Sequence, residues 1–92
     1  MTGAARPSLV VKRSVTIAGH STSISLEQPF WQGLGRIAKE SGVSIAALLR
    51  RIDATRDEAG GVQENLSSAI RVFVLRHFAA EAGVDLGADL AD

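Results

Sequence analysis

The first third of the chain has two stretches typical of β-strands. Residues 9–17 (LVVKRSVTI) are rich in β-branched side chains. Residues 22–26 (TSISL) alternate, with Ile24 and Leu26 on one face and serines on the other. The four residues between them include Gly19 and predict a turn. The pattern fits a hairpin within one chain, and it also fits pairing of the second strand with its copy in another chain.

Helical spacing of apolar residues follows, with helices predicted at residues 28–41, 45–58 and 66–82. Pro29 suits the first turn of a helix, and Gly42 suits the position just after the end of one. Ser44 and Asn65 are good N-cap residues for the second and third helices. The third helix has an unusually wide apolar stripe, which fits either a helix nearly enclosed by its own chain or one that faces a partner subunit. The small size of the chain favours the partner subunit.

The chain has 92 residues and a mass of 9.7 kDa, which limits it to one domain with a thin stability margin. We expect a disordered N-terminal arm at residues 1–8 and a folded domain at residues 9–82. Residues 83–92 (GVDLGADLAD) are acidic and aperiodic, and they predict a flexible tail.

Formal net charge is zero, which by itself disfavours nucleic-acid binding because such domains are usually basic. Residues 1–51 carry seven cations against two anions, a net +5, and residues 52–92 carry three against eight, a net −5. This asymmetry predicts a basic surface and an acidic tail, although chance clustering on a solvated face gives the same counts.

Several classes of protein are disfavoured. The chain has no cysteine, no apolar run long enough to span a bilayer, and no secretory signal at its start, so we expect a cytoplasmic protein without membrane contact. Its two histidines, His20 and His77, lack the spacing of a metal site with two histidines four apart, and no nucleophile or phosphate-binding motif occurs. We therefore expect no enzyme activity, no metal and no cofactor.

A binding function has more support in the first half of the chain. Two adjacent cations and a row of hydroxyls occupy the predicted strands, and a two-stranded ribbon fits the major groove of DNA. The alternative is an ordinary polar sheet face, since serine and threonine are common on the solvent side of strands. The candidate DNA-binding residues of the strands are Lys12, Arg13, Ser14, Thr16, Ser21, Ser23 and Ser25.

The order and spacing of these elements resemble the ribbon-helix-helix family of DNA-binding proteins, to which the Arc and methionine repressors belong. The residues that carry the resemblance are Ile24, Ser25, Leu26, Pro29, Leu34, Ile37, Ala38, Gly42, Ser44, Leu48 and Leu49. Over residues 12–78 the chain looks in particular like a bacterial subfamily of short, poorly characterised members.

The resemblance implies a mainly α fold with a β-ribbon, assembled as an intertwined homodimer. It implies that alternate residues of the ribbon read bases and that Gly42, Val43 and Ser44, before the second helix, hold a backbone phosphate. The residues expected in the shared dimer core are Ile24, Leu26, Trp31, Leu34, Leu48, Leu49 and Phe73.

The chain departs from the family pattern in three ways. Its outward ribbon positions are serines, its basic pair lies on an additional N-terminal strand, and a third helix follows the usual two. The leading hypothesis is a DNA-binding transcription regulator, acting as a repressor, with double-stranded DNA and a second copy of the chain as partners. The alternative is an antitoxin-like or adaptor dimer that binds a protein through the third helix and the acidic tail.

Overall fold

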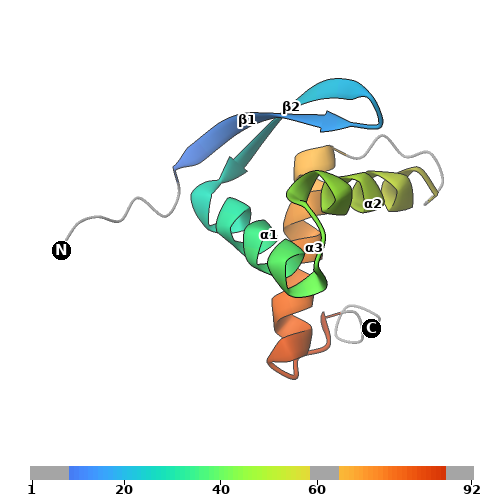
Figure 1. The fold of residues 1–92 in the computed structure, drawn as a ribbon. Helices are drawn as coiled ribbons and strands as arrows, with labels where there is room; N and C mark the ends of the chain where they lie inside the picture. Colours follow the sequence, from blue (N-terminus) through green and yellow to red (C-terminus); the bar gives the residue numbers. More distant parts are fainter. Residues whose placement is uncertain (1–8, 59–64, 87–92) are drawn as a thin grey trace.

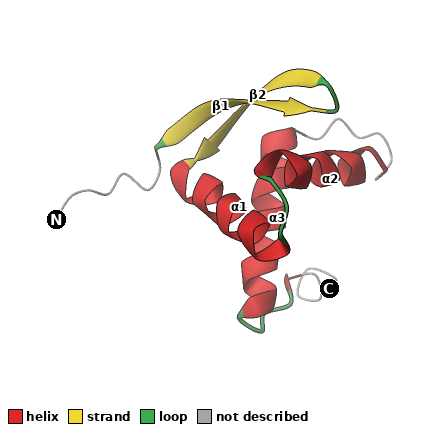
Figure 2. Ribbon diagram, in the orientation of Figure 1, coloured by secondary structure: helices red, strands yellow, loops and turns green. Residues whose placement is uncertain are grey.

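A computed structural model describes residues 9–58 and 65–86, and Figure 1 shows their arrangement. Two strands, β1 and β2, precede three helices, α1 to α3. The expected arm at residues 1–8, the break at residues 59–64 and the end of the expected tail at residues 87–92 lie outside the described residues. Figure 2 shows the division between a β-hairpin and a helical layer, the mainly α fold with a ribbon that was expected.

The two strands form an antiparallel hairpin within one chain, which was one of the two pairings left open by the sequence. Strand β1 spans Val10–Ile17 and β2 spans His20–Glu27. They are joined by Ala18 and Gly19, whose φ angles are 52° and 85°, as a type I′ hairpin turn requires. Because this turn has only two residues, His20 and Ser21 pair with β1, and β2 is longer than predicted.

Helices α1 and α2 have the predicted bounds. Helix α1 spans Gln28–Ser41 and ends at Gly42, whose left-handed φ of 72° allows its N–H to bond back to the last turn. Helix α2 spans Ile45–Glu58, and the Ser44 hydroxyl accepts a hydrogen bond of 3.0 Å from the Ala47 N–H.

Helix α3 spans Leu66–Glu81, one residue shorter than predicted. Asn65 caps it by accepting the Ser67 N–H at 2.8 Å. Its N-terminal end lies near the hairpin, and its C-terminal end lies on the far side of the molecule (Figure 1). The described residues include no helix that is long and apolar enough to cross a membrane.

The core lies between the hairpin and the helices. Six of the seven residues expected in a dimer core are buried within the single chain, and Phe73 is half-buried. The chain therefore encloses a core of its own. The buried residues are Ile17, Ile24, Leu26, Trp31, Leu34, Ile37, Ala38, Leu48, Leu49, Ile52, Ile70 and Val74.

Close packing of α1 against α3 depends on Gly33. A Cβ atom at this position would lie 2.9 Å from a Val74 methyl carbon and 3.3 Å from the Phe78 ring. Such distances are shorter than ordinary van der Waals contact, so the helices approach each other only because Gly33 has no side chain. Trp31, two residues earlier, ties α1 to the hairpin by donating its Nε1–H to the Val11 carbonyl at 2.9 Å.

Candidate nucleic-acid interface

The register of the hairpin sorts its side chains into two faces. Directly paired residues in an antiparallel sheet share a face, and successive residues of a strand alternate between faces. Ile24 and Leu26 are buried, so their partners Arg13 and Val11 belong to the same inner face. Four cross-strand pairs then share the opposite face, and they are Val10 with Glu27, Lys12 with Ser25, Ser14 with Ser23, and Thr16 with Ser21.

The outer face thus contains six of the seven strand residues predicted to contact DNA. Five of them are exposed and Ser25 is half-buried. The helices lie on the other side of the hairpin (Figure 1). Arg71 of α3 reaches the end of the outer face at Glu27, and the rest of this face is open. It presents five hydroxyl groups and one ammonium group, which can bond to phosphate oxygens and to base edges.

Arg13 is the exception among the predicted strand residues. It faces the helices, and its guanidinium lies 5.0 Å from the centre of the Trp31 ring, in the geometry of a cation–π contact. Its neighbour Lys12 points to the outer face. The adjacent cations of the sequence therefore do not form one basic patch.

The connection between α1 and α2 contains the predicted phosphate contacts. The N–H of Gly42 donates to the Lys39 carbonyl at 3.2 Å, and the N–H of Val43 donates to the Ala38 carbonyl at 3.0 Å. These amides close the end of α1 and are engaged within the chain. Ser44 is exposed at the start of α2, where the positive end of the helix dipole lies.

Helix α3 supports the end of the hairpin through two contacts that the sequence did not reveal. Arg71 binds Glu27, with nitrogen–oxygen distances of 2.8 and 3.3 Å, and the Ser67 hydroxyl donates to the Ser25 carbonyl at 2.9 Å. The Arg71 hydrogen bond, together with a backbone hydrogen bond, lowers the pKa of Glu27 below its ordinary value of 4.5. The partners are too distant in sequence for helical or strand spacing to pair them.

An apolar groove of about 700 Å³ is lined by residues of α1, α2 and α3, and it includes no residue of the hairpin. Phe73 and Val72 line it from α3, and Arg51 and Arg76 contribute charge at its edge. Val72 is 43% exposed and Leu75, one turn further along α3, is 56% exposed. The wide stripe of α3 is therefore only partly covered by its own chain.

The order of elements, a two-stranded ribbon followed by helices, agrees with a comparison against known families, in which residues 10–78 match the ribbon-helix-helix domain. The chain is a ribbon-helix-helix protein. Ribbon-helix-helix proteins are generally DNA-binding transcription regulators or antitoxins, they typically form dimers, and they are typically not enzymes.

A solved structure of a bacterial protein is similar to this ribbon-helix-helix chain. That protein is an uncharacterized one from Bordetella pertussis Tohama I, and it is 33% identical, with a TM-score of 0.72. The similarity covers 90% of the present chain and 68% of that one. No curated protein matches the chain significantly.

Proposed function

We propose that this ribbon-helix-helix protein is a DNA-binding transcription regulator, acting as a repressor, that inserts the outer face of its β1–β2 hairpin into the major groove. The observation that carries the proposal is the hairpin register, which gathers Lys12 and five hydroxyl residues on one open face. An antiparallel two-stranded ribbon has a width that the major groove admits.

The chemistry of this face suits close approach to DNA. Serine and threonine are short, so the strand backbone lies near the base edges, where hydroxyls donate and accept hydrogen bonds. Lys12 adds a cation for a phosphate or for the acceptor atoms of guanine. Glu27, the acidic residue at the end of this face, is bound by Arg71, which reduces its repulsion of phosphate.

We further propose a homodimer formed through the exposed side of α3, where Val72 and Leu75 are available. Each chain contains a complete hairpin, so a dimer would carry two ribbons. Two-fold symmetry would then place them on two half-sites of an inverted repeat, separated by about one turn of DNA or a multiple of it.

The test is selection of bound duplexes from a random pool, followed by fluorescence anisotropy with the selected sequence. We expect a dissociation constant below about 1 μM at ~50 mM salt, with affinity falling steeply as salt is raised. Absence of detectable binding at ~50 mM salt would contradict the proposal.

A pair of variants separates the ribbon from general charge effects. Ser23→Asp adds a negative charge at the centre of the outer face and should abolish specific binding through repulsion of phosphate. Ala80→Asp adds the same charge at an exposed position near the far end of α3, and it should leave most of the affinity intact. Equal loss of affinity in both variants would show that the hairpin is not the contact surface.

A second candidate function is an antitoxin-like or adaptor role, and the exposed apolar residues of α3 favour it. Removing α3 would not test this role cleanly, because Ile70 and Val74 belong to the core. Leu75→Glu is better suited, since its side chain is exposed. Capture of a stoichiometric partner of different mass by the wild type, and not by Leu75→Glu, would support this role.

A further inference from the structure

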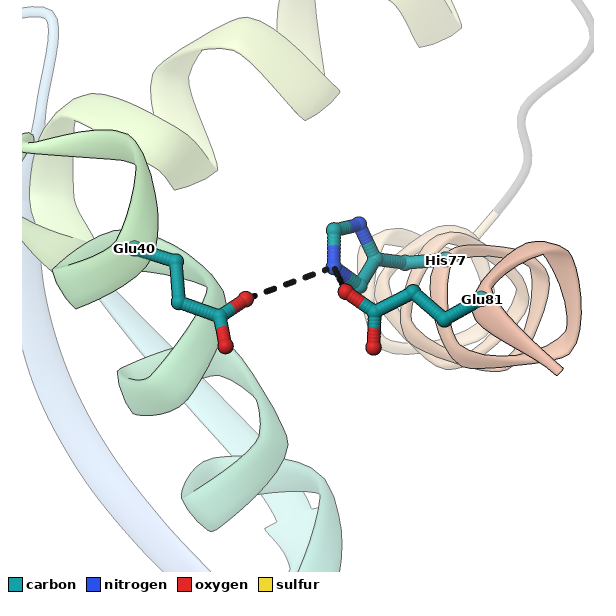
Figure 3. Close-up of side chains that lie close together, drawn as sticks. All are labelled: Glu40, His77 and Glu81. Atoms are coloured by element: carbon teal, nitrogen blue, oxygen red, sulfur yellow. Dashed lines mark ion pairs between the residues drawn. The ribbon is translucent and has the colours of Figure 1, made fainter.

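Three side chains with metal-binding groups converge where the C-terminal halves of α1 and α3 meet. Figure 3 shows Glu40 pointing from α1 toward His77 and Glu81 of α3. The His77 Nε2 lies 3.2 Å from a Glu81 carboxylate oxygen and 3.8 Å from a Glu40 oxygen. One donor atom from each residue lies within 4.8 Å of the other two.

The folding of the chain accounts for this convergence. His77 and Glu81 are four residues apart on α3, so they lie on the same side of the helix one turn apart. Glu40 comes from α1, and the missing side chain at Gly33 lets the two helices lie close together. Sequence spacing alone shows the pair on α3 and gives no sign of Glu40.

The surroundings fix both the imidazole and one carboxylate. The His77 ring lies between Phe73, with ring centres 6.5 Å apart, and Phe78, with ring centres 5.1 Å apart. Arg36 binds the Oε2 of Glu40 at 3.2 Å, while Oε1 is the oxygen nearer to His77. A carboxylate with one oxygen held by a neighbouring group is already oriented for binding through the other.

The His77 Nε2 is a buried polar atom without a hydrogen bond among the described residues. Two carboxylate oxygens are near it, yet neither satisfies it by hydrogen bonding. A buried polar atom without a partner is unfavourable, and an ion between the three donor atoms would satisfy it.

We propose that Glu40, His77 and Glu81 form a binding site for one divalent transition-metal ion, best suited to Zn²⁺. One imidazole nitrogen and two carboxylates are ordinary Zn²⁺ ligands, whereas Mg²⁺ and Ca²⁺ prefer oxygen ligands alone. Donor atoms around a tetrahedral Zn²⁺ lie about 3.4 Å apart, from metal–ligand distances of about 2.1 Å.

Two of the three donor separations are near that geometry, and the third, between the two carboxylates, is no more than 4.8 Å. The separations of 3.2 and 3.8 Å from His77 already bracket the tetrahedral separation. The Glu40 and Glu81 side chains are 44% and 49% exposed, so both can adjust toward an ion while Arg36 keeps its contact with the Glu40 Oε2. Water would complete the coordination. The bound ion would join α1 to α3 and stabilise the folded state by mass action.

The test uses the full-length chain without an affinity tag, titrated with Zn²⁺ by calorimetry and with Co²⁺ by visible absorption. We expect one ion per chain, Co²⁺ bands in the visible region, and a higher melting temperature with Zn²⁺ than with Mg²⁺. His77→Gln should weaken Zn²⁺ binding by about tenfold or more. The matched control is His20→Gln, which removes the exposed histidine of the hairpin and should bind Zn²⁺ like the wild type.

His77 packs against two aromatic rings, so His77→Gln could lose Zn²⁺ binding simply by failing to fold. A second variant distinguishes these two causes. Glu81→Gln changes an exposed side chain, so it should stay folded by circular dichroism and also lose about tenfold or more in affinity. Zn²⁺ binding that is the same in Glu81→Gln as in the wild type would overturn the proposal. So would absence of binding at millimolar Zn²⁺, in which case the three side chains are neighbours that hold no metal.

Discussion

At the scale of single residues, Lys12 and Arg13 show how one position along a strand changes the role of a cation. They are neighbours in sequence and both are exposed, yet they point to opposite faces of the hairpin. Arg13 lies over Trp31, which is itself held by Val11. The sequence predicted a basic pair for DNA, and the pairing register places Lys12 on the outer face and Arg13 against Trp31.

This division predicts different effects for two alanine variants. Lys12→Ala should leave the free energy of unfolding almost unchanged, weaken DNA binding, and reduce the slope of log affinity against log salt by about one. Arg13→Ala should lose about 0.5–1 kcal/mol of stability, the usual contribution of an exposed cation–π contact, with a smaller effect on the salt slope. Denaturant titration and anisotropy measure the two quantities. Identical behaviour of both variants would be inconsistent with the register.

The hairpin turn predicts a stabilising substitution. Ala18 has a φ of 52°, and the left-handed region is unfavourable for alanine by roughly 1–2 kcal/mol. Asparagine tolerates this region, so Ala18→Asn should raise stability by up to about 1 kcal/mol in urea denaturation. Ala18→Val, which is β-branched, should lower it. A stabilising effect of valine would mean that this residue has a different backbone conformation in solution.

At the scale of secondary structure, residues at helix ends and turns predicted where the elements lie. Contacts between residues distant in sequence determine how those elements pack together. Gly42 and Ser44 mark the end of α1 and the start of α2 because each acts on its own helix terminus. Six of the predicted DNA-binding residues lie on the same face of the hairpin, because successive residues of a strand alternate between faces and the two-residue turn sets which residues pair. The attachment of α3 to β2, and the approach of Glu40 to His77, could not be predicted because they depend on how distant elements pack.

The packing of α1 on α3 gives a matched pair of glycine substitutions. Gly35→Ala should stabilise the protein by about 0.5–1 kcal/mol through helix propensity, since the new Cβ would lie 3.9 Å from its nearest neighbour. Gly33→Ala meets Val74 at 2.9 Å, and the overpacking costs about 1–3 kcal/mol. Thermal unfolding should therefore rank Gly35→Ala above Gly33→Ala. The reverse order would contradict a close helix contact at Gly33.

The ion pair between β2 and α3 predicts a dependence of stability on pH. The folded-state pKa of Glu27 lies below 4.5, so its ionised form is favoured by folding. The stabilisation is complete above the unfolded pKa of about 4.5 and is lost as the pH falls through the lower folded-state value. The stability difference between wild type and Glu27→Gln should therefore narrow on acidification. Arg71→Met should remove the same pH-dependent part of the stability. If the stability difference between wild type and Glu27→Gln instead widens in acid, the dependence does not come from the ionised Glu27.

At the scale of the whole molecule, the apolar pattern predicted which residues are buried and left open how much of that burial one chain provides. An apolar stripe shows that one face of a helix is kept from water. It does not show whether that face is covered by the chain's own third helix or by a second copy of the chain. Six of the seven residues expected in a shared core are enclosed by one chain, because Ile70 and Val74 of α3 complete that core. The remaining apolar surface of α3 is what a partner could cover.

If the exposed side of α3 forms the proposed dimer interface, a substitution there should affect assembly without affecting folding. Leu75→Glu should convert the proposed dimer into a monomer while circular dichroism and the melting curve at low protein concentration stay near those of the wild type. Leu9→Glu changes a side chain of similar exposure, 52% against 56%, at the start of the hairpin and should leave the dimer intact. Light scattering coupled to size-exclusion chromatography gives the masses. A Leu75→Glu variant that remains dimeric would exclude α3 as the interface.

The hairpin has a further consequence for behaviour on dilution. Its strands are joined through Ala18 and Gly19, so their effective concentration toward each other is fixed by the turn and does not depend on how many molecules are present. A ribbon assembled from two chains would disappear whenever its dimer dissociated. Because both strands belong to one chain, the ribbon does not depend on the proposed dimer, and a single molecule would still present a complete ribbon.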